Sequence, residues 1–374
     1  MHRSHILLLT VPALGLLLLR AHADARAIAP VHEAQDLSEY ELLCYCEAPG
    51  PLPQNIVRMD NNGEILLACR AGETRGQLGR ARIDHSESQI QLLKDWRLLQ
   101  EDAGVLRTQV PVLPPPETLA LRARMRKHAA VIASHIRGDL RALTAQLKAV
   151  GRDRNTFAVL FSYVLDGLVW EQLNQRGLVK ERKLSVEEPL WSGVFWASYP
   201  PRSFTCGTNS ERRGNKELFI SWSRSSRQLM KPFLADWRSV SRMFEQLSSG
   251  GRVTDTGLRR LFAPYELFDQ QGRFTGPVLK EVSGDPLYER SLAIAARVAE
   301  DVERRIDPAR VSSELGLGNE QAALVIAYHE LMWELLDNLE RAGALRRPAF
   351  FAAPERARPA DFGDLILIVE HAPR

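Results

Sequence analysis

The sequence predicts an α+β protein that is mainly helical, and three observations lead to this prediction. Long apolar patterns with helical spacing fill 158–179 and 323–345. The segment 189–222 instead interleaves aromatic residues with Pro and Gly, as strands and turns do. Hydrophobic residues make up 45% of the chain, which is enough for ordinary globular cores.

Residues 1–27 contain the parts of a secretory signal peptide in the required order. A basic start with Arg3 is followed by an apolar run from Ile6 to Leu19 and by small residues at 21–23 and 25–27. The apolar run is shorter than the roughly 20 residues that a membrane-spanning helix needs. We therefore expect a cleaved signal, a periplasmic or extracellular protein, and no transmembrane helix after cleavage.

The net charge of the chain bears on its partners. The formal charge is +3, and cleavage after Ala27 would leave 46 basic and 45 acidic residues. Domains that bind nucleic acid usually carry a basic patch or stripe. The near balance of charges therefore disfavours a nucleic-acid partner and leaves an unknown ligand or an envelope protein as the expected partner.

Four cysteines, Cys44, Cys46, Cys69 and Cys206, suggest two disulfides in an oxidising compartment. A bridge between Cys44 and Cys46 would close a tight ring, so we expect one of them to pair with Cys69 and the other with Cys206. The spacing does not fit a standard zinc finger or ribbon. No metal and no cofactor are predicted.

The segment 28–85 is expected to contain a hairpin. Two apolar stretches, 56–59 and 64–67, flank the turn-forming residues Asp60-Asn61-Asn62-Gly63. A turn ending in Asn-Gly favours reversal of the chain between two strands.

Two segments of the chain, 86–180 and 251–347, follow a similar order of elements. Each has a helix with a polar cap, at Ser86 or Thr254, then a short hairpin turning at 101–104 or 270–272, then a further helix. This order resembles winged-helix architecture and suggests an internal duplication, although one gap is needed to align the two copies. The likeness concerns the order of elements and supplies no function.

The aromatic, strand-rich insertion 181–250 lies between these units, and the tail 348–374 should add a short strand at 365–369. Exposed aromatic rings can stack on sugars, bases or apolar groups, and nearby arginines can contact an anionic portion. Packing in a core would explain the same residues. The candidate ligand-binding residues are Trp191, Trp196, Tyr199, Arg202 and Trp222.

Two carboxylates are the candidate catalytic residues. Asp166 stands in a helix that is otherwise almost entirely apolar, so it needs an ion-pair partner, exposure to water or a raised pKa. Glu330 follows His329 in the second long helix, but Trp333 stands where a zinc protease would have its second histidine. A site between the two copies would bring Asp166 and Glu330 face to face.

Three functions remain open from the sequence. The first is a secreted or periplasmic, non-enzymatic binding protein that uses the aromatic insertion or the groove between the copies. The second is a cell-envelope hydrolase that uses Asp166 and Glu330 as paired carboxylates. The third is a winged-helix transcription regulator with a misleading N-terminus.

Overall fold

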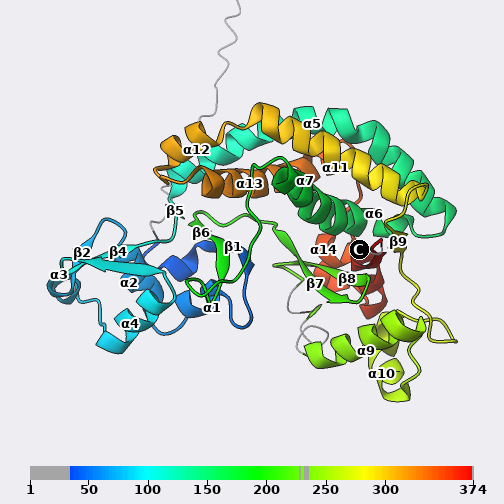
Figure 1. Cartoon of the computed structure of the whole chain (residues 1–374), viewed down its shortest axis with the longest axis horizontal. Helices are drawn as coiled ribbons and strands as arrows, with labels where there is room; N and C mark the ends of the chain where they lie inside the picture. Colours follow the sequence, from blue (N-terminus) through cyan, green and yellow to red (C-terminus); the bar gives the residue numbers. More distant parts are fainter. Residues whose placement is uncertain (1–33, 227–228, 231–235, 373–374) are drawn as a thin grey trace, which may run out of the picture. The chain divides into compact units, whose positions relative to one another are not determined.

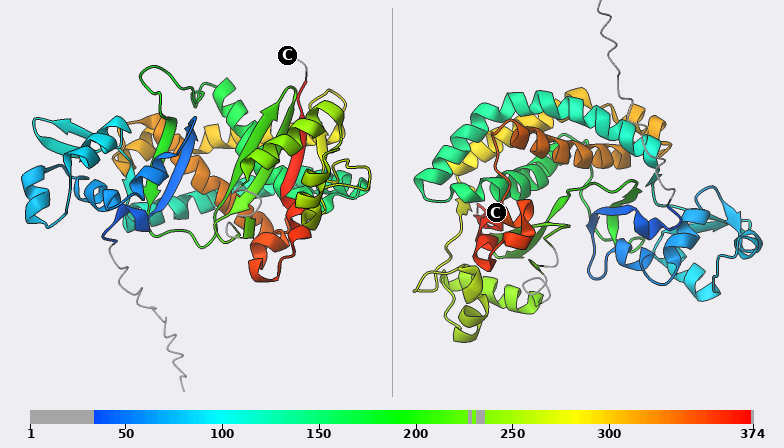
Figure 2. Two further views of the ribbon diagram at one scale, coloured as in Figure 1. Left: turned by 90° about the horizontal axis from the view of Figure 1, so that it is seen from below. Right: turned by 180° about the vertical axis from the view of Figure 1, so that it is seen from behind.

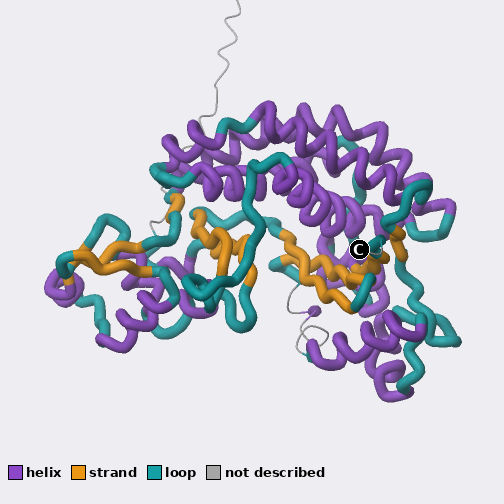
Figure 3. Tube along the Cα trace, in the orientation of Figure 1, coloured by secondary structure: helices purple, strands orange, loops and turns teal. Residues whose placement is uncertain are grey.

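The computed structural model describes residues 34–226, 229–230 and 236–372. Helices hold 54% of these described residues and strands 16%, which confirms a mainly helical α+β fold (Figures 1 and 3). The strands form three small sheets in the part of the chain described. The predicted signal peptide lies outside the described residues, and none of the described helices is long and apolar enough to cross a membrane.

The chain from Leu37 to Ala68 begins with a short 3₁₀ helix (Leu37–Glu39) and strand β1 (Glu41–Glu47). The predicted hairpin at 56–67 is wrong, because helices α1 (Pro53–Val57) and α2 (Asn62–Ala68) occupy this segment. Neighbouring residues Ile56 and Val57 are both buried, as are Ile65 and Leu66. Adjacent buried pairs suit a helix, since a half-buried strand would bury only alternate residues.

The next segment joins three strands and two helices: β2 (Glu73–Thr74), α3 (Arg75–Arg80), α4 (Glu87–Asp95), β3 (Leu99–Asp102) and β4 (Val105–Thr108). The strand order in the sheet is β2-β4-β3. Ser86 caps α4 through a capping box with Gln89, as its position predicted. Ala103 and Gly104 both have positive φ, 48° and 79°, which lets a two-residue loop close the predicted hairpin between β3 and β4.

The long helix α5 (Pro115–Ala149) follows strand β5 (Val112–Leu113). Pro115 fits the first turn of the helix because the amide hydrogen that proline lacks would have no helical partner there. Helices α11 (Pro286–Arg305) and α13 (Glu320–Arg341) pack along α5, and α12 (Pro308–Leu315) lies between them in sequence (Figures 1 and 2).

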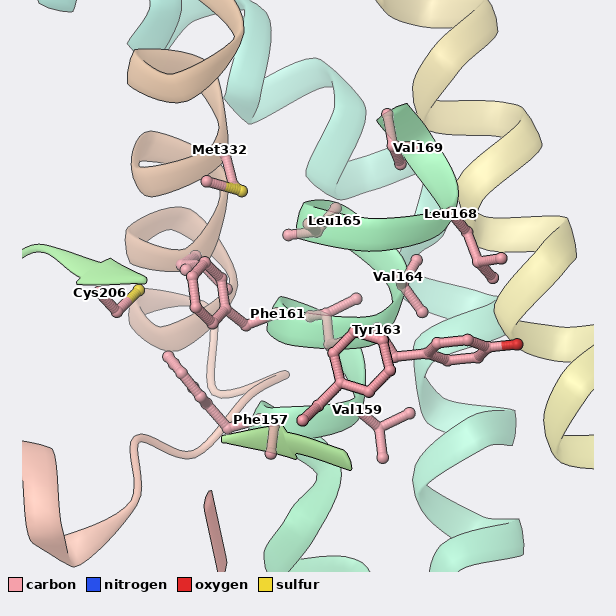
Figure 4. Close-up of a cluster of buried hydrophobic side chains, with 14 of the residues drawn as sticks. Phe157, Val159, Phe161, Tyr163, Val164, Leu165, Leu168, Val169, Cys206 and Met332 are labelled. Atoms are coloured by element: carbon pink, nitrogen blue, oxygen red, sulfur yellow. The ribbon is translucent and has the colours of Figure 1, made fainter. Parts of the chain in front are cut away.

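The apolar stretch 156–175 and the three residues before it form one continuous helical rod. It starts as a 3₁₀ turn (Asp153–Asn155) and α6 (Thr156–Ala158), widens into a π-helix (Val159–Leu168), and continues as α7 (Val169–Gln175). In Figure 4, Phe161 points toward Cys206 and Met332, whereas Tyr163 points away from them. Long π-helical stretches are rare and often occur at functional sites.

The aromatic insertion forms strands, as expected, but they belong to two sheets. Strand β6 (Ser192–Ser198) pairs antiparallel with β1 and parallel with β5. Strands β7 (Cys206–Arg213) and β8 (Lys216–Ser223) join β10 (Ile366–Glu370) and β9 (Val278–Lys280) in the order β7-β8-β10-β9. The predicted C-terminal strand is therefore present.

The second predicted unit has α9 (Trp237–Gly250) before it and α10 (Thr256–Phe262) within it. The cap of α10 is Asp255, one residue after the expected Thr254. The predicted hairpin at 270–272 amounts to a single bridge between Phe268 and Phe274. Further short helices are Ala263–Tyr265, α14 (Ala349–Ala352), Pro354–Arg356 and Pro359–Leu365. The duplication and the two winged-helix units at 86–180 and 251–347 stay predictions.

The expected cysteine pairing is wrong. Cys44 and Cys46 form a disulfide with each other, while Cys69 and Cys206 are buried free thiols. Alternate residues of a strand share a face, so the two sulfur atoms on β1 can meet. Cys69 and Cys206 cannot pair because they lie in different hydrophobic cores, one formed by the N-terminal elements and one by the long helices and the β7-β8-β10-β9 sheet.

Candidate functional site

A cleft of about 780 Å³ brings together segments from the whole length of the chain. One side of the helical rod lines it with residues spaced as one helical face, from Tyr163 to Asn174, and the β7–β8 hairpin contributes alternate residues of its strands. We call it the Asp166 cleft. Its charged lining residues are Glu47, Asp166, Glu171, Lys180, Glu181, Arg182, Arg212, Glu217, Glu281 and His371.

Asp166 is the carboxylate at the centre of the rod's polar face. It accepts a hydrogen bond from the indole Nε1 of Trp170, one helical turn later, at 3.3 Å. Burial raises the pKa of Asp166 to about 6, against the effect of hydrogen bonds from Thr208 and Trp170. This carboxyl group therefore changes its charge close to neutral pH.

Aromatic rings stack beside Asp166. The ring centroids of Tyr45 and Trp170 lie 4.2 Å apart, and Trp170 meets Tyr328 edge to face at 4.5 Å. The Tyr328 hydroxyl donates a hydrogen bond to the carbonyl of Leu165 at 2.7 Å, which ties α13 to the π-helix. Tyr45 and Trp170 line the cleft and are held in place by this packing.

A histidine bridges two further carboxylates at another part of the cleft. His371 directs Nδ1 to Glu281 at 2.8 Å and Nε2 to Glu217 at 3.0 Å. These hydrogen bonds raise the pKa of His371 to about 9, so both ring nitrogens donate at neutral pH. Burial opposes ionisation of Glu217, but the hydrogen bond from His371 lowers the pKa of Glu217 overall.

Tyr163 extends this group toward the π-helix. Its hydroxyl donates to Glu281 at 3.0 Å, and burial together with the charge of Glu281 raises the pKa of Tyr163. The tyrosine hydroxyl is consequently neutral at physiological pH. Glu281, His371 and Glu217 thus form a partly buried chain of hydrogen bonds that begins at Tyr163.

The guanidinium of Arg182 covers the aromatic part of the cleft. Its Cζ lies 4.0 Å from the centroid of the Tyr45 ring, although the arginine itself is exposed. The segment 180–182 also lines a second cleft of about 300 Å³, which Tyr45 lines as well. This short segment therefore stands between two clefts that share an aromatic residue.

Glu330, the second candidate catalytic residue, lies elsewhere. It is 1% exposed, and its carboxylate accepts hydrogen bonds from Arg122 Nε at 3.2 Å and Arg202 Nη2 at 2.6 Å. Arg202 also donates to Glu334 at 2.9 Å. Glu330 does not line the Asp166 cleft. The structure thus places Asp166 in a cleft and Glu330 in a buried ion cluster, which gives no support to their action as a pair.

The aromatic residues proposed to bind a ligand have mostly structural surroundings. Trp196 is fully buried and Trp191 is 8% exposed, so packing in a core accounts for both side chains, and a ligand-binding role for them stays a prediction. The indole Nε1 of Trp191 donates to the carbonyl of Trp96 at 2.8 Å. Arg202, by its contacts with Glu330 and Glu334, belongs to the buried ion cluster.

Tyr199 and Trp222 are partly exposed. The centroids of the Tyr199 and Tyr40 rings lie 5.2 Å apart. The Trp222 ring lies directly over Gly207. A Cβ on Gly207 would overlap with the Trp222 ring. A ligand-binding role for Tyr199 and Trp222 stays a prediction.

The sequence draws attention to Asp166 but not to most of its neighbours. Tyr45, Arg182, Glu217, Glu281 and His371 come from five separate segments, and no spacing in the sequence connects them. One signal was available in the β7–β8 hairpin, where Thr208, Ser210 and Arg212 alternate along one strand face, as Glu217 and Phe219 do on the next.

Over the residues that the structure describes, no group of three or more His, Cys, Asp or Glu side chains is arranged to hold a metal ion. Comparisons of the chain with protein-family models, curated proteins and solved structures find no match. Any function assigned to the chain therefore depends on the geometry and chemistry of the Asp166 cleft.

Proposed function

We propose that this protein is an exported, non-enzymatic binding protein whose ligand occupies the Asp166 cleft. The observation that carries the proposal is the composition of that cleft: stacked aromatic rings beside a titrating carboxylate, in a concave site of about 780 Å³. Sites for small molecules commonly combine an aromatic wall with a few converging polar groups.

Binding is favoured over hydrolysis because several of the candidate acids and bases already have partners. His371 bridges Glu217 and Glu281, and Glu330 is bonded to two arginines. A catalytic acid and base must be able to exchange protons with a substrate. Among the described residues, no second carboxylate is bonded to Asp166 that could share such a task, and its hydrogen-bond donors are the neutral side chains of Trp170 and Thr208.

Export is the second part of the proposal and depends on the signal peptide predicted at 1–27. A disulfide on β1 is compatible with an oxidising compartment. Under this proposal the ligand is a molecule of the cell envelope or the surroundings of the cell.

A tryptophan placed in the cleft tests the proposal. The mature protein is screened by thermal unfolding against small molecules grouped as cations, anions, sugars and neutral amides, since a ligand of the folded state raises the melting temperature. Ser210 lines the cleft and is exposed, so Ser210→Trp should abolish the shift caused by a true ligand. Ser88→Trp, at an exposed position of α4, should leave the shift unchanged.

Two results would contradict the proposal. A ligand that binds Ser210→Trp as well as it binds the unmodified protein occupies another site. A molecule that stabilises the protein only briefly, and is recovered as cleaved product, makes the protein a hydrolase.

One observation favours the transcription-regulator alternative, namely the order of the elements near the N-terminus, and the charge of helix α4 opposes it. Helix α2, strand β2, helices α3 and α4, and strands β3 and β4 follow one another in the order of a winged helix, within 62–108. The exposed residues of α4 include Glu87, Ser88, Gln91 and Asp95, and the two acids would repel DNA phosphates. Salt-sensitive binding of duplex DNA by the full chain, lost when Gln91 is replaced by Glu, would support this alternative.

A further inference from the structure

We propose that the Asp166 cleft recognises a guanidinium or alkylammonium group, and that Arg182 competes with the ligand for this subsite. This inference rests on the proposed function and names the chemical class of its ligand. It begins from one contact: a guanidinium belonging to the chain itself stacks on the Tyr45 ring.

The Tyr45 ring is a suitable platform for a cation. The face of an aromatic ring carries partial negative charge and attracts guanidinium and ammonium groups. Tyr45 is held between neighbours: Trp170 stacks on it at 4.2 Å, and its strand pairs with Val194 of β6. The Cys44–Cys46 disulfide joins the residues on either side of Tyr45. A ring fixed in this way does not need to be ordered when a ligand binds.

A carboxylate completes the recognition of a cation. Asp166 is bonded to the Trp170 indole, whose ring stacks on Tyr45, and the charge of Arg182 is felt at Asp166. An aromatic ring next to a carboxylate satisfies both the flat face and the charge of an organic cation. In the structure Arg182 lies over the Tyr45 ring, and its charge lowers the pKa of Asp166.

The overall charge of the cleft points in the same direction. Six carboxylates line it, against four cationic groups including His371. Removal of Arg182 from the ring would leave three cationic groups. The lining thus attracts a cation, and more strongly when Arg182 has moved away.

Arg182 is placed where it can be displaced. It is exposed, and no carboxylate of the described residues forms an ion pair with it. The chain around it, from Lys180 to Glu187, is exposed at every position and contains no helix or strand. An incoming cation would therefore have to displace Arg182 from the Tyr45 ring, but it would not have to break a buried ion pair.

Calorimetric titration with two matched probes tests this inference. The probes are Nα-acetyl-L-arginine amide and Nα-acetyl-L-citrulline amide, called arginine amide and citrulline amide below; they have nearly the same shape, but only the first carries a cation, its guanidinium. We expect the exported protein to bind arginine amide roughly tenfold more tightly than citrulline amide. Arg182→Gln removes the competitor and should tighten arginine amide binding roughly two- to fivefold.

Substitutions of Tyr45 distinguish the contribution of its ring to ligand affinity from that of its hydroxyl group. Tyr45→Leu should abolish the preference for arginine amide, whereas Tyr45→Phe should lose less affinity because it keeps a ring. Since Tyr45 is largely buried, its variants are compared only if their thermal unfolding remains cooperative. Arg182→Gln, at an exposed position, keeps the test decisive if they do not fold.

Equal affinity for the two amides, or weaker binding by Arg182→Gln, would overturn the inference. Its failure can be told apart from failure of the proposed function. If other molecules bind and Ser210→Trp blocks them, the cleft is the binding site and only the cationic ligand is wrong. If arginine amide binds Ser210→Trp with full affinity, both proposals fail.

Discussion

The negative charge of the Asp166 carboxylate destabilises the folded protein. Burial raises its pKa in the folded protein to about 6, above the usual value for aspartate. The folded state therefore holds this proton more tightly than the unfolded chain does. The stabilisation that comes from this tighter proton binding is fully present below the pKa of aspartate in the unfolded chain, about 3.9. It is lost as the pH rises through about 6, the pKa of Asp166 in the folded protein.

Replacement of Asp166 by Asn should stabilise the protein at alkaline pH, because the amide cannot ionise. We expect a gain of about 3 kcal/mol in the free energy of unfolding at pH 8, shrinking toward zero between pH 6 and pH 4. Urea unfolding of both proteins across this range measures the difference. Asp102→Asn, at the exposed end of β3, is the control and should change stability by less than about 0.5 kcal/mol.

A constant difference across the pH range would show that the Asn variant acts through packing or hydrogen bonding. The expected result would mean that the chain keeps a destabilising carboxylate in a cleft. Residues that lower stability in this way are often retained for function. The sequence alone draws attention to this residue, because a carboxylate within an apolar helix stands out without knowledge of its neighbours.

At the scale of elements, two ion pairs join helices α5 and α13, one buried and one with an exposed arginine. Arg122 of α5 contacts Glu330 of α13, and it also lies 3.6 Å from Glu41 of β1. Arg126, one turn later on α5, contacts Glu334, one turn later on α13. The two helices are thus connected at matching turns.

Arg122 and Arg124 are a matched pair for testing this connection. Arg122→Ala leaves Glu330 buried with one arginine fewer and should reduce the free energy of unfolding by about 3–5 kcal/mol. Arg124, on the same helix, forms a more exposed ion pair with Glu314, so Arg124→Ala should cost less than about 1 kcal/mol. Urea unfolding of the two variants gives the comparison, and equal losses would contradict a special role for the buried pair.

The elements also show which local patterns carry reliable information. The hairpin 101–104 and the cap at Ser86 were predicted correctly, since each depends on backbone geometry set by a few adjacent residues. The hairpin predicted at 56–67 failed because Asn61, Asn62 and Gly63 fit the start of a helix as well as a turn. The packing of α1 and α2 against their core decided between them.

At the scale of the whole molecule, two hydrophobic cores explain the state of the cysteines. Cys69 belongs to the N-terminal core and Cys206 to the larger one, and burial raises the pKa of both thiols. For Cys69 the pKa rises to about 11. Two protonated thiols, each enclosed in its own core, are poor nucleophiles for disulfide exchange.

Intact-mass analysis of the exported protein tests the disulfide and the export together. We expect the mass of a chain that begins at Ile28, contains one disulfide, and gains two alkyl groups from a thiol reagent only after unfolding in urea. Alkylation in the folded state would contradict burial of the thiols. Recovery of the protein in the cytoplasm with residues 1–27 intact would contradict export.

The sequence by itself determined the mainly helical α+β class, the helix cap at Ser86, the hairpin at 101–104, the C-terminal strand and the presence of a carboxylate, Asp166, inside an apolar helix. Each follows from local periodicity, turn geometry or the energy of burying a charge. Only the tertiary structure decided the cysteine pairing, the burial of Trp191 and Trp196, the separation of Glu330 from the cleft, and the meeting of Asp166 with Tyr45, Arg182 and His371. All of these features depend on which distant segments of the chain share a core or a cleft. A single sequence does not show which distant segments are close in space.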